Sequence, residues 1–419
     1  MASPTRTRAG RARPLRAPVS SVPVPALLTA SRSRAVTDFT TELCTDTARF
    51  SAIAPEWNAL HRASRTATPF QSHAWLYSWW LSYGTGGRTG ARGSGPGRLR
   101  VVLVRRRGEL VAAAALMRVR RPFPVLVPLG GTISDFSDVL LDDSRTEEET
   151  DACADALTRA LAELARTAVI DLREVRPGAA AERVRARWTG PRRRLADSTC
   201  LELPAVPMDA LLARLPAARA QRFRAKLRKL DALGIEERAV PPAEVPAAVS
   251  RMLELHRLQW EGRGITPEHL SARFAEHLTR SARSMVATGD ARLTEFRLAG
   301  AVVAADLTLV SGGLAGGYLY GADPALRARK VDVATMLLRR GARESGGDGR
   351  TTLSMLRGNE PYKHHWRPET LRNQRLLLAG PALAPLLWLL FARAAGRERV
   401  AALVKRLRGR EGGEGGDKR

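Results

Sequence analysis

Apolar and polar residues alternate along the chain in two kinds of local pattern. Short apolar runs are typical of strands, and apolar residues at three- to four-residue spacing are typical of helices. In the first half these patterns predict strands over residues 99–105, 110–118, 169–175 and 200–203 and a helix over residues 146–166. Arg107, Gly108 and Glu109 separate the first pair of strands as the turn of a hairpin, and Pro204 and Pro207 mark a boundary near residue 204.

The second half repeats this arrangement with clearer patterns. It predicts helices over residues 208–233, 244–260, 267–288 and 332–344, and strands over residues 235–240, 292–298, 301–310, 314–320, 351–355 and 372–379. The strands from 292 to 320 follow one another as a meander, and a helix and another strand come next. Both halves therefore contain hairpins, then a helix, then a strand, which indicates a duplicated α+β unit rather than a solenoid of short repeats.

Composition is that of a globular protein. The chain has 419 residues, 44% of them hydrophobic and 26% charged, a length that suits two or three domains. Cys44, Cys153 and Cys200 are scattered without CxxC spacing, which excludes a disulfide scaffold and a thiolate zinc site and fits a reducing cytoplasm. We therefore expect a cytoplasmic protein without a metal.

The net charge of +26 is unevenly distributed. Residues 1–40 contribute +6 and residues 393–419 contribute +5, so much of the excess lies near the ends. Only six of the 68 basic residues are lysine, and such a bias toward arginine is more simply a property of a GC-rich genome. A basic patch alone is only an electrostatic footprint, so the charge argues against a dedicated nucleic-acid function.

Both ends of the chain have distinctive compositions. Residues 1–36 are Arg-rich and interrupted by prolines, which predicts a disordered basic tail rather than a signal peptide. Residues 376–392 lack charge but contain Gly380, Pro381 and Pro385, so they predict a strand, a turn and a short helix over 386–394 rather than a spanning helix. The remainder of 381–419 has the pattern of a basic amphipathic helix and tail. It either packs on the domain or contacts an anionic membrane surface.

A basic loop precedes the helix predicted at 332–344. Arg327, Arg329 and Lys330 lie between a strand and the helix start, where free backbone N–H groups and positive charge can bind a pyrophosphate. The alternative is an ordinary loop with Asp332 as the helix N-cap.

A dense group of reactive side chains follows the strand at 351–355. Glu360, Tyr362 and Lys363 are close in sequence to His364 and His365, and such density on a loop indicates a site. Adjacent histidines diverge on a helix and cannot both face one metal.

Aromatic residues near position 75 form another candidate region. Trp75, Trp79 and Trp80 share a helical face just after Gln71. They belong either to the core or to a wall of a substrate cleft.

Taken in order, several segments resemble a known family. "WNAL", "TPFQSHAWLYSWW" and "PLGGTISDFSDVLLDD" in the first half, then "LHRLQWEGRG", "GGLAGGYLYGADPALRARKVDVATMLLRRGA" and "LRGNEPYKHHWRPETLRNQ" in the second, resemble the CelD/BcsL family of the GNAT acyltransferase superfamily. That family is similar to FemAB-type enzymes, which carry two GNAT-like domains in one chain. The resemblance implies an α+β fold with a degenerate GNAT-like domain at 37–204 and a donor-binding GNAT domain at 205–380, each with its own mixed sheet and with a cleft between them.

The resemblance also implies acyl transfer to an amine, typically from acetyl-CoA. The GNAT pyrophosphate loop has the frame Gln/Arg-x-x-Gly-x-Gly/Ala, which the segment Arg329, Lys330, Val331, Asp332, Val333 and Ala334 matches except that Asp332 replaces glycine. A carboxylate at that position repels a pyrophosphate unless it turns away to cap the helix. The donor is therefore either acetyl-CoA or a different acyl carrier.

The chemistry of the family suggests roles for other residues. A carboxylate takes the amine proton, and Glu360 is the first candidate and Asp306 the second. Tyr362 or Tyr320 protonates the leaving thiolate. Lys363 binds phosphate or an acidic acceptor, or it closes the strand end, while Arg357 binds substrate or pairs with Glu360.

The first half offers candidates for acceptor binding. Asp135 and Asp138 lie on a loop after two glycines, where they contact a hydroxylated or amino acceptor or serve as turn residues. Gln71 and Trp75 are the other candidates. The expected acceptor is a small molecule or a saccharide.

Two other functions stay open. One is a non-catalytic accessory protein of polysaccharide biosynthesis, and the other is a FemAB-like transferase that uses aminoacyl-tRNA. The second is suggested by the basic run Arg214, Arg219, Arg222, Arg224, Lys226, Arg228 and Lys229.

Overall fold

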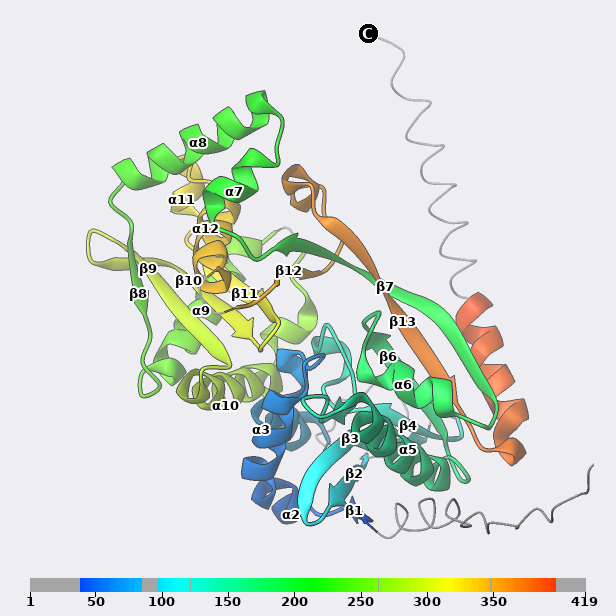
Figure 1. Ribbon diagram of the computed structural model, residues 1–419. Coiled ribbons are helices and arrows are strands. Elements are labelled where there is room, and N and C mark those ends of the chain that lie inside the picture. Colours follow the sequence, from blue (N-terminus) through cyan, green and yellow to red (C-terminus); the bar gives the residue numbers. More distant parts are fainter. Residues whose placement is uncertain (1–37, 85–96, 121, 263, 347–348, 397–419) are drawn as a thin grey trace, which may run out of the picture. The chain divides into compact units, whose positions relative to one another are not determined.

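A computed structural model describes residues 38–84, 97–120, 122–262, 264–346 and 349–396 (Figure 1). The tails expected at 1–36 and 410–419, and the basic segment expected after residue 396, lie outside the described residues.

The described strands form one mixed β-sheet. Its order is β1 (Phe39–Cys44), β2 (Arg98–Arg106), β3 (Glu109–Arg120), β4 (Pro124–Pro128), β6 (Val169–Val175), β13 (Glu369–Leu378), β7 (Arg192–Pro204), β12 (Thr352–Arg357), β11 (Leu314–Ala322), β10 (Ala301–Val310), β9 (Ala291–Leu298) and β8 (Glu236–Ala239). The short β5 (Leu140–Leu141) pairs with β3. Pairing is antiparallel except between β4 and β6 and between β11 and β12.

The expectation of a separate sheet in each half is wrong. β7 is 13 residues long, whereas the sequence pattern predicts only residues 200–203. Its C-terminal end pairs with β12, and β13 pairs with β7 and also with β6. Strands of the two halves therefore pair with one another in one sheet, across the boundary expected near residue 204. The domain limits given above stay a prediction.

Helices cover the sheet. They are α2 (Thr47–Ala52), α3 (Ala54–Ala63), α4 (His73–Trp79), α5 (Glu147–Leu164), α6 (Ala180–Arg187), α7 (Met208–Ala213), α8 (Ala217–Ala232), α9 (Val245–Trp260), α10 (Ala272–Thr288), α11 (Ala325–Ala328), α12 (Val333–Ser345) and a helix over residues 384–396. The single helix expected over 208–233 is two helices, because Pro216 lacks an N–H and starts α8 as its N-cap. A 3₁₀ turn, Pro267–Leu270, precedes α10, and Ser271 caps that helix.

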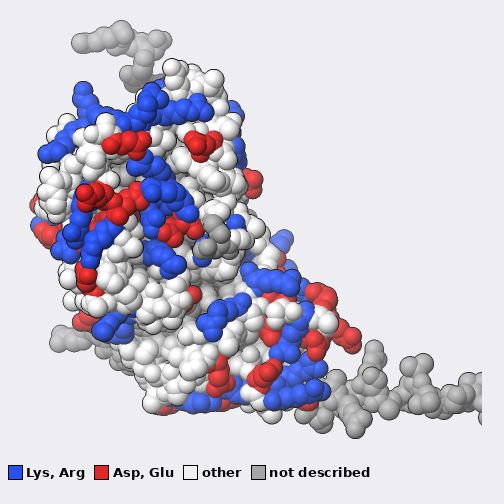
Figure 2. All heavy atoms as spheres, turned by 60° about the vertical axis from the view of Figure 1, so that its left-hand side comes forward, with Lys and Arg blue, Asp and Glu red and all other residues white. Residues whose placement is uncertain are grey.

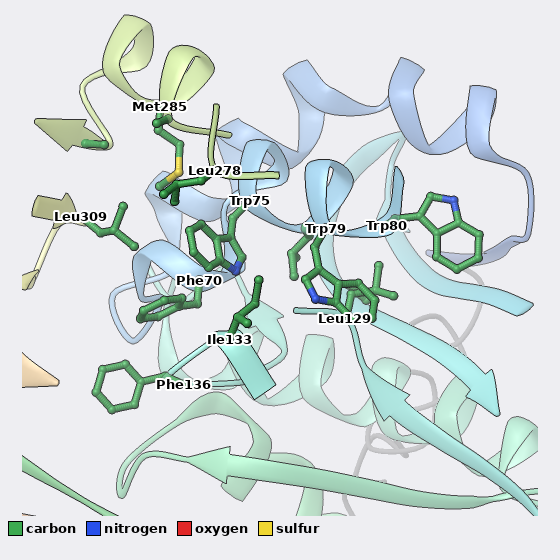
Figure 3. Packing of buried hydrophobic residues seen from close by; sticks show 14 of the residues in the cluster. Phe70, Trp75, Trp79, Trp80, Leu129, Ile133, Phe136, Leu278, Met285 and Leu309 are labelled. Atoms are coloured by element: carbon green, nitrogen blue, oxygen red, sulfur yellow. The ribbon is translucent and has the colours of Figure 1, made fainter. Parts of the chain in front are cut away.

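A hydrophobic core joins the two halves where α4 meets α10. Trp75 is fully buried and its ring lies edge-on to His277, with ring centres 4.5 Å apart. Figure 3 shows Trp75 of the first half between Ile133 on one side and Leu278 and Met285 of the second half on the other. The Ser78 hydroxyl donates a hydrogen bond to the His277 carbonyl at 3.0 Å. A packed core, not a cleft, therefore connects the halves at this place.

Candidate active site

β11 and β12 separate shortly after they meet. They pair in register at only three positions, from Leu314 opposite Thr352 to Gly316 opposite Ser354. Beyond these positions β12 pairs on its other side with β7, where Arg357 is opposite Cys200. Leu356 has φ +56°, a left-handed conformation that changes the course of the strand just before Arg357. The split leaves backbone groups of β11 beyond Gly316 without a strand partner on this side.

A small pocket of about 110 Å³ lies beside this split. Leu337, Leu338 and Gly341 of α12 form its apolar wall. Polar side chains from β10, β11 and the segment after β12 complete it: Asp306, Thr308, Tyr320, Tyr362 and Lys363. Several of the residues expected to carry chemistry are thus brought together, although they come from different elements.

Asp306 is the buried carboxylate of this pocket. It lies on β10 directly opposite Tyr320 of β11 and is 5% exposed. Burial raises the pKa of Asp306 to about 6, and a 2.7 Å hydrogen bond from the Thr308 hydroxyl to Oδ2 only partly opposes this effect. A carboxyl group with such a pKa exchanges protons close to neutral pH.

Two phenols lie near this carboxylate. Gln259 of α9 donates a hydrogen bond from Nε2 to the Tyr320 hydroxyl at 3.0 Å and accepts one from the Ala322 backbone N–H at 3.1 Å. These bonds fix the position of the Tyr320 ring. Tyr362 is 45% exposed, and the partial burial of its side chain, with contributions from Tyr320 and Glu360, raises its pKa to about 12, so this phenol keeps its proton at neutral pH. Sequence reasoning missed Gln259, because nothing in a single polar residue near a helix end indicates its partners.

The segment after β12 is held by ion pairs and hydrogen bonds. Arg357 Nε lies 2.5 Å from Asp135 Oδ1, and its Nη1 lies 3.3 Å from Glu174 Oε1. Lys363 Nζ donates to the Arg357 carbonyl at 2.9 Å and lies 2.9 Å from Glu360 Oε2. Arg357 therefore links the site to the first half through Asp135. Glu360 is exposed and does not line the 110 Å³ pocket, so its position favours Asp306 as the base.

A second pocket, of about 440 Å³, surrounds the start of α12. Arg327, Lys330 and Lys226 contribute positive charge to it, and Val331, Asp332 and Val333 also line it. Asp323 is its second carboxylate, and its Oδ1 accepts a hydrogen bond from Ala325 N at 2.8 Å. Arg329 is not among its lining residues, and Ala334 lines the smaller pocket instead. Figure 2 views this side of the molecule, where Lys and Arg side chains gather over α8 at the upper end.

Asp332 caps α12. Its Oδ1 accepts a hydrogen bond from the Thr335 backbone N–H at 3.0 Å, and its Oδ2 pairs with Lys226 Nζ of α8. Burial alone would raise the pKa of Asp332, but hydrogen bonds from Lys226 and Thr335 hold it below its usual value. The carboxylate is therefore ionised and neutralised, and the geometry is the capping arrangement that the sequence left open.

The candidates of the first half have structural partners. Asp138 caps α6 by accepting hydrogen bonds from Ala180 N and Ala181 N at 2.9 and 2.8 Å. Gln71 accepts a hydrogen bond from Thr68 N at 2.9 Å, and Trp75 Nε1 donates to Ser134 Oγ at 2.8 Å. Both side chains are buried in the core, so the expectation that Gln71, Trp75 and Asp138 face an acceptor has no support in their surroundings. Of these candidates only Asp135 touches the site, through Arg357.

Comparison with known families gives a match in the second half. Residues 217–364 match a family model described as an acetyltransferase (GNAT) domain. All residues that line the two pockets fall within this match. A comparison with curated proteins gives no match.

Solved structures extend the similarity to both halves. The chain is similar to the crystal structure of FemX, with a TM-score of 0.55 and 13% identity over 80% of this chain and 98% of that one. It is also similar to a conserved protein of unknown function from Bacteroides thetaiotaomicron, with a TM-score of 0.50 and 13% identity over 81% and 100%. Identities this low show the fold alone. The expected α+β fold of GNAT type is confirmed, while membership of the CelD/BcsL family stays a prediction.

Proposed function

We propose that the protein transfers an acyl group from a CoA thioester to an amine. The observation that carries this proposal is the adjacency of the two pockets. Val333 lines the basic pocket and the next residue, Ala334, lines the pocket that contains Asp306. Gln259 lines the basic pocket and is hydrogen-bonded to Tyr320 in the other.

The basic pocket has the chemistry of a phosphate site. The start of a helix supplies N–H groups and a positive dipole, and Arg327 and Lys330 add charge, while Lys226 offsets Asp332. CoA carries several phosphate charges and suits such a pocket. Asp332 is compatible with it, since its carboxylate is bound to Thr335 N and Lys226 and is thereby neutralised.

The smaller pocket has the groups that amine acylation needs. Asp306 takes the proton from the amine as the nitrogen bonds to the thioester carbonyl carbon. The C–S bond then breaks, and Tyr362 or Tyr320 gives a proton to the departing sulfur. Backbone N–H groups along the open edge of β11 suit the oxygen that becomes negative in the transition state. The small volume favours a short acyl group such as acetyl.

The acceptor is proposed only by class. We propose an amine of a small molecule or saccharide, as the resemblance to a family of polysaccharide biosynthesis implies, with the segment from Arg357 to Lys363 beside it. The link from Arg357 to Asp135 gives the first half a supporting position in this arrangement.

One observation favours a second candidate, transfer from an aminoacyl-tRNA. Lys226 lines the basic pocket, and on the same helix Arg222, Arg224, Arg228 and Lys229 are exposed. A polyanionic carrier would contact this surface outside the pocket, whereas CoA is small enough to be held by the pocket residues alone.

Calorimetry with acetyl-CoA tests the first proposal. We expect binding at submillimolar concentration, weakened by Arg327→Ala or Lys330→Ala and unchanged by Arg62→Ala, a matched control on the exposed surface of α3. Thiol release from acetyl-CoA is then followed with a panel of amines such as glucosamine, lysine and spermidine.

Absence of acetyl-CoA binding at millimolar concentration would overturn the CoA proposal. Mobility shift with charged and uncharged tRNA then tests the second candidate, which requires that charge reversal of Arg224 and Arg228 abolishes the shift.

A further inference from the structure

The helix over residues 384–396 is apolar on both faces. Its inner face is held by Leu387, which is fully buried against the sheet with Val169, Leu195 and Leu377. In Figure 1 it lies alongside β7 and β13. A helix with an apolar inner face ordinarily presents polar residues to water on its outer face.

The outer face of this helix departs from that rule. Trp388 is 48% exposed and Leu389 is 40% exposed, and Pro385 and Ala392 are exposed beside them. Spacings of three and four residues place these side chains on one face. Large apolar side chains with such exposure are few among the described residues, and here two of them are adjacent.

Positive charge borders this apolar face. The Arg193 guanidinium lies 3.8 Å from the centre of the Trp388 ring. Its neighbours on β7, Arg192 and Arg194, alternate to the other face of the sheet. Arg393 is exposed on the helix itself. Residues 376–396 contain no acidic residue, and residues 393–419 hold nine basic and four acidic residues.

We propose that the outer face of helix 384–396 docks the protein on an anionic membrane surface. Tryptophan prefers the headgroup region, and leucine and proline beside it enter the acyl boundary while arginines contact lipid phosphates. Each basic residue near an anionic leaflet contributes about 1 kcal/mol. No helix among the described residues is long and apolar enough to cross the bilayer, which agrees with a helix that lies in the interface plane.

The positive charge around the outer face of helix 384–396 favours a membrane, rather than a second copy of the chain, as its binding partner. In a symmetric dimer the same patch faces itself, so Arg193 and Arg393 would approach their own copies. An anionic lipid surface instead complements these charges. This inference does not depend on the proposed acyl transfer.

Sedimentation with lipid vesicles tests the proposal on the full-length protein. We expect binding to vesicles that contain phosphatidylglycerol, weaker binding at higher salt, and little binding to pure phosphatidylcholine. The double variant Trp388→Gln/Leu389→Gln should lower the partition coefficient at least tenfold. Leu270→Gln is the matched control, because Leu270 is 54% exposed and lies outside this helix.

A depth-sensitive signal separates insertion from simple charge attraction. Brominated phosphatidylglycerol should quench tryptophan fluorescence in the wild type, and Trp388→Phe should remove most of that quenching while the vesicles still bind. Unchanged melting temperatures show that the variants are folded.

Two outcomes would overturn the proposal. One is equal binding of the wild type and the double variant to phosphatidylglycerol vesicles. The other is a dimer in sedimentation velocity that the double variant abolishes, without vesicle binding, which would make a second copy the occupant.

Discussion

Two helices occupy corresponding places in the two halves, and the first turn of one is acidic whereas that of the other is uncharged and follows a basic loop. α5 follows the strands β2 to β4 and precedes β6, which is parallel to β4, and α12 follows β9 to β11 and precedes β12, which is parallel to β11. Glu147, Glu148 and Glu149 fill the first turn of α5. No acidic residue lies in the first turn of α12, whose N-cap Asp332 is paired with Lys226. Glu147 and Glu149 are ion-paired with Arg183 and Arg106, as Asp332 is with Lys226. What distinguishes α12 is therefore the loop before it, where Arg327 and Lys330 line a pocket at the positive end of the helix dipole.

Buried carboxylates differ between the halves in the same way. Asp138 in the first half is held by the N–H groups of Ala180 and Ala181 and completes α6. Asp306 in the second half has one short hydrogen bond, from Thr308, and lines a pocket. A group with all its partners inside the fold has a structural role, and one that borders a pocket is available for chemistry. Both carboxylates are buried, so the difference between them lies in their hydrogen-bond partners and in whether they border a pocket.

Loss of the Asp306 carboxylate should have the largest effect. In Asp306→Asn we expect kcat/KM for thiol release from acetyl-CoA to fall by about 10²–10⁴. Wild-type activity should rise with pH through about 6, where Asp306 loses its proton, and this limb should be absent from the residual activity. Unchanged activity in Asp306→Asn would reassign the base to another group such as Glu360.

The same substitution should change the pH dependence of stability. The pKa of Asp306 is about 6 in the folded protein against 3.8 for the free group, so the folded state binds more protons between these values. The contribution of Asp306 to stability therefore falls by about 3 kcal/mol as pH rises from 4 to 7. Burial lowers the pKa values of His269 and His277 to about 4 and about 3, and these groups act in the opposite direction over the same range, so the test is the difference between the two proteins. In denaturant unfolding, the free energy of the wild type should fall relative to that of Asp306→Asn as pH rises. A parallel dependence in both proteins would contradict the burial argument.

Charge reversal at α12 should make its start resemble that of α5. The double variant Arg327→Glu/Lys330→Glu should raise the Kd for acetyl-CoA at least 100-fold, or about 2.8 kcal/mol. Calorimetry measures this change. The reciprocal variant, with Glu147, Glu148 and Glu149 changed to Gln, should leave the stoichiometry at one, because Arg145 just before α5 is already paired with Asp142 and Glu109. A second bound acetyl-CoA would show that charge alone distinguishes the halves.

Removal of the Asp138 cap should affect stability alone. Asp138→Ala should lower the free energy of unfolding by about 1–2 kcal/mol, the usual range for a lost N-cap. Thermal melting measures the loss, and activity per folded molecule at 20 °C should stay at the wild-type level. Lower turnover with unchanged melting would place Asp138 in the acceptor site after all.

Arg329 and Glu360 should matter least. Arg329→Ala should change the acetyl-CoA Kd less than threefold, because Arg329 does not line the basic pocket, whereas Arg327→Ala should change it more. Glu360→Gln should likewise change turnover less than threefold, since its exposed carboxylate is paired with Lys363. Larger effects would indicate that this loop closes over the bound donor.

The sequence predicted the elements whose signals are local. The hairpin β2–β3, the helix α5 and the meander β9–β11 each have their own turns and periodicity, and all three are confirmed. Asp306 was only the second candidate after Glu360 from the sequence, and its role as the base stays a prediction.

Features set by distant partners were not predictable in this way. The start of β7 at Arg192 lies in a polar stretch, and only its pairing with β13 makes it a strand. The partners of Asp332 and Gln259 come from other elements, and no spacing in the sequence indicates them. Pro216, by contrast, was a usable local signal for the break between α7 and α8.

The position of β13 has a consequence for the order in which the protein can fold during synthesis. β6 and β7 are complete once residue 204 has been made, yet the strand that lies between them ends at Leu378. Until then the nascent first half exposes two unpaired strand edges, which are templates for wrong pairing. β13 can therefore fill the gap between β6 and β7 only after the chain through Leu378 has left the ribosome. Because this pairing joins residues far apart in sequence, we expect the complete sheet to form late in folding.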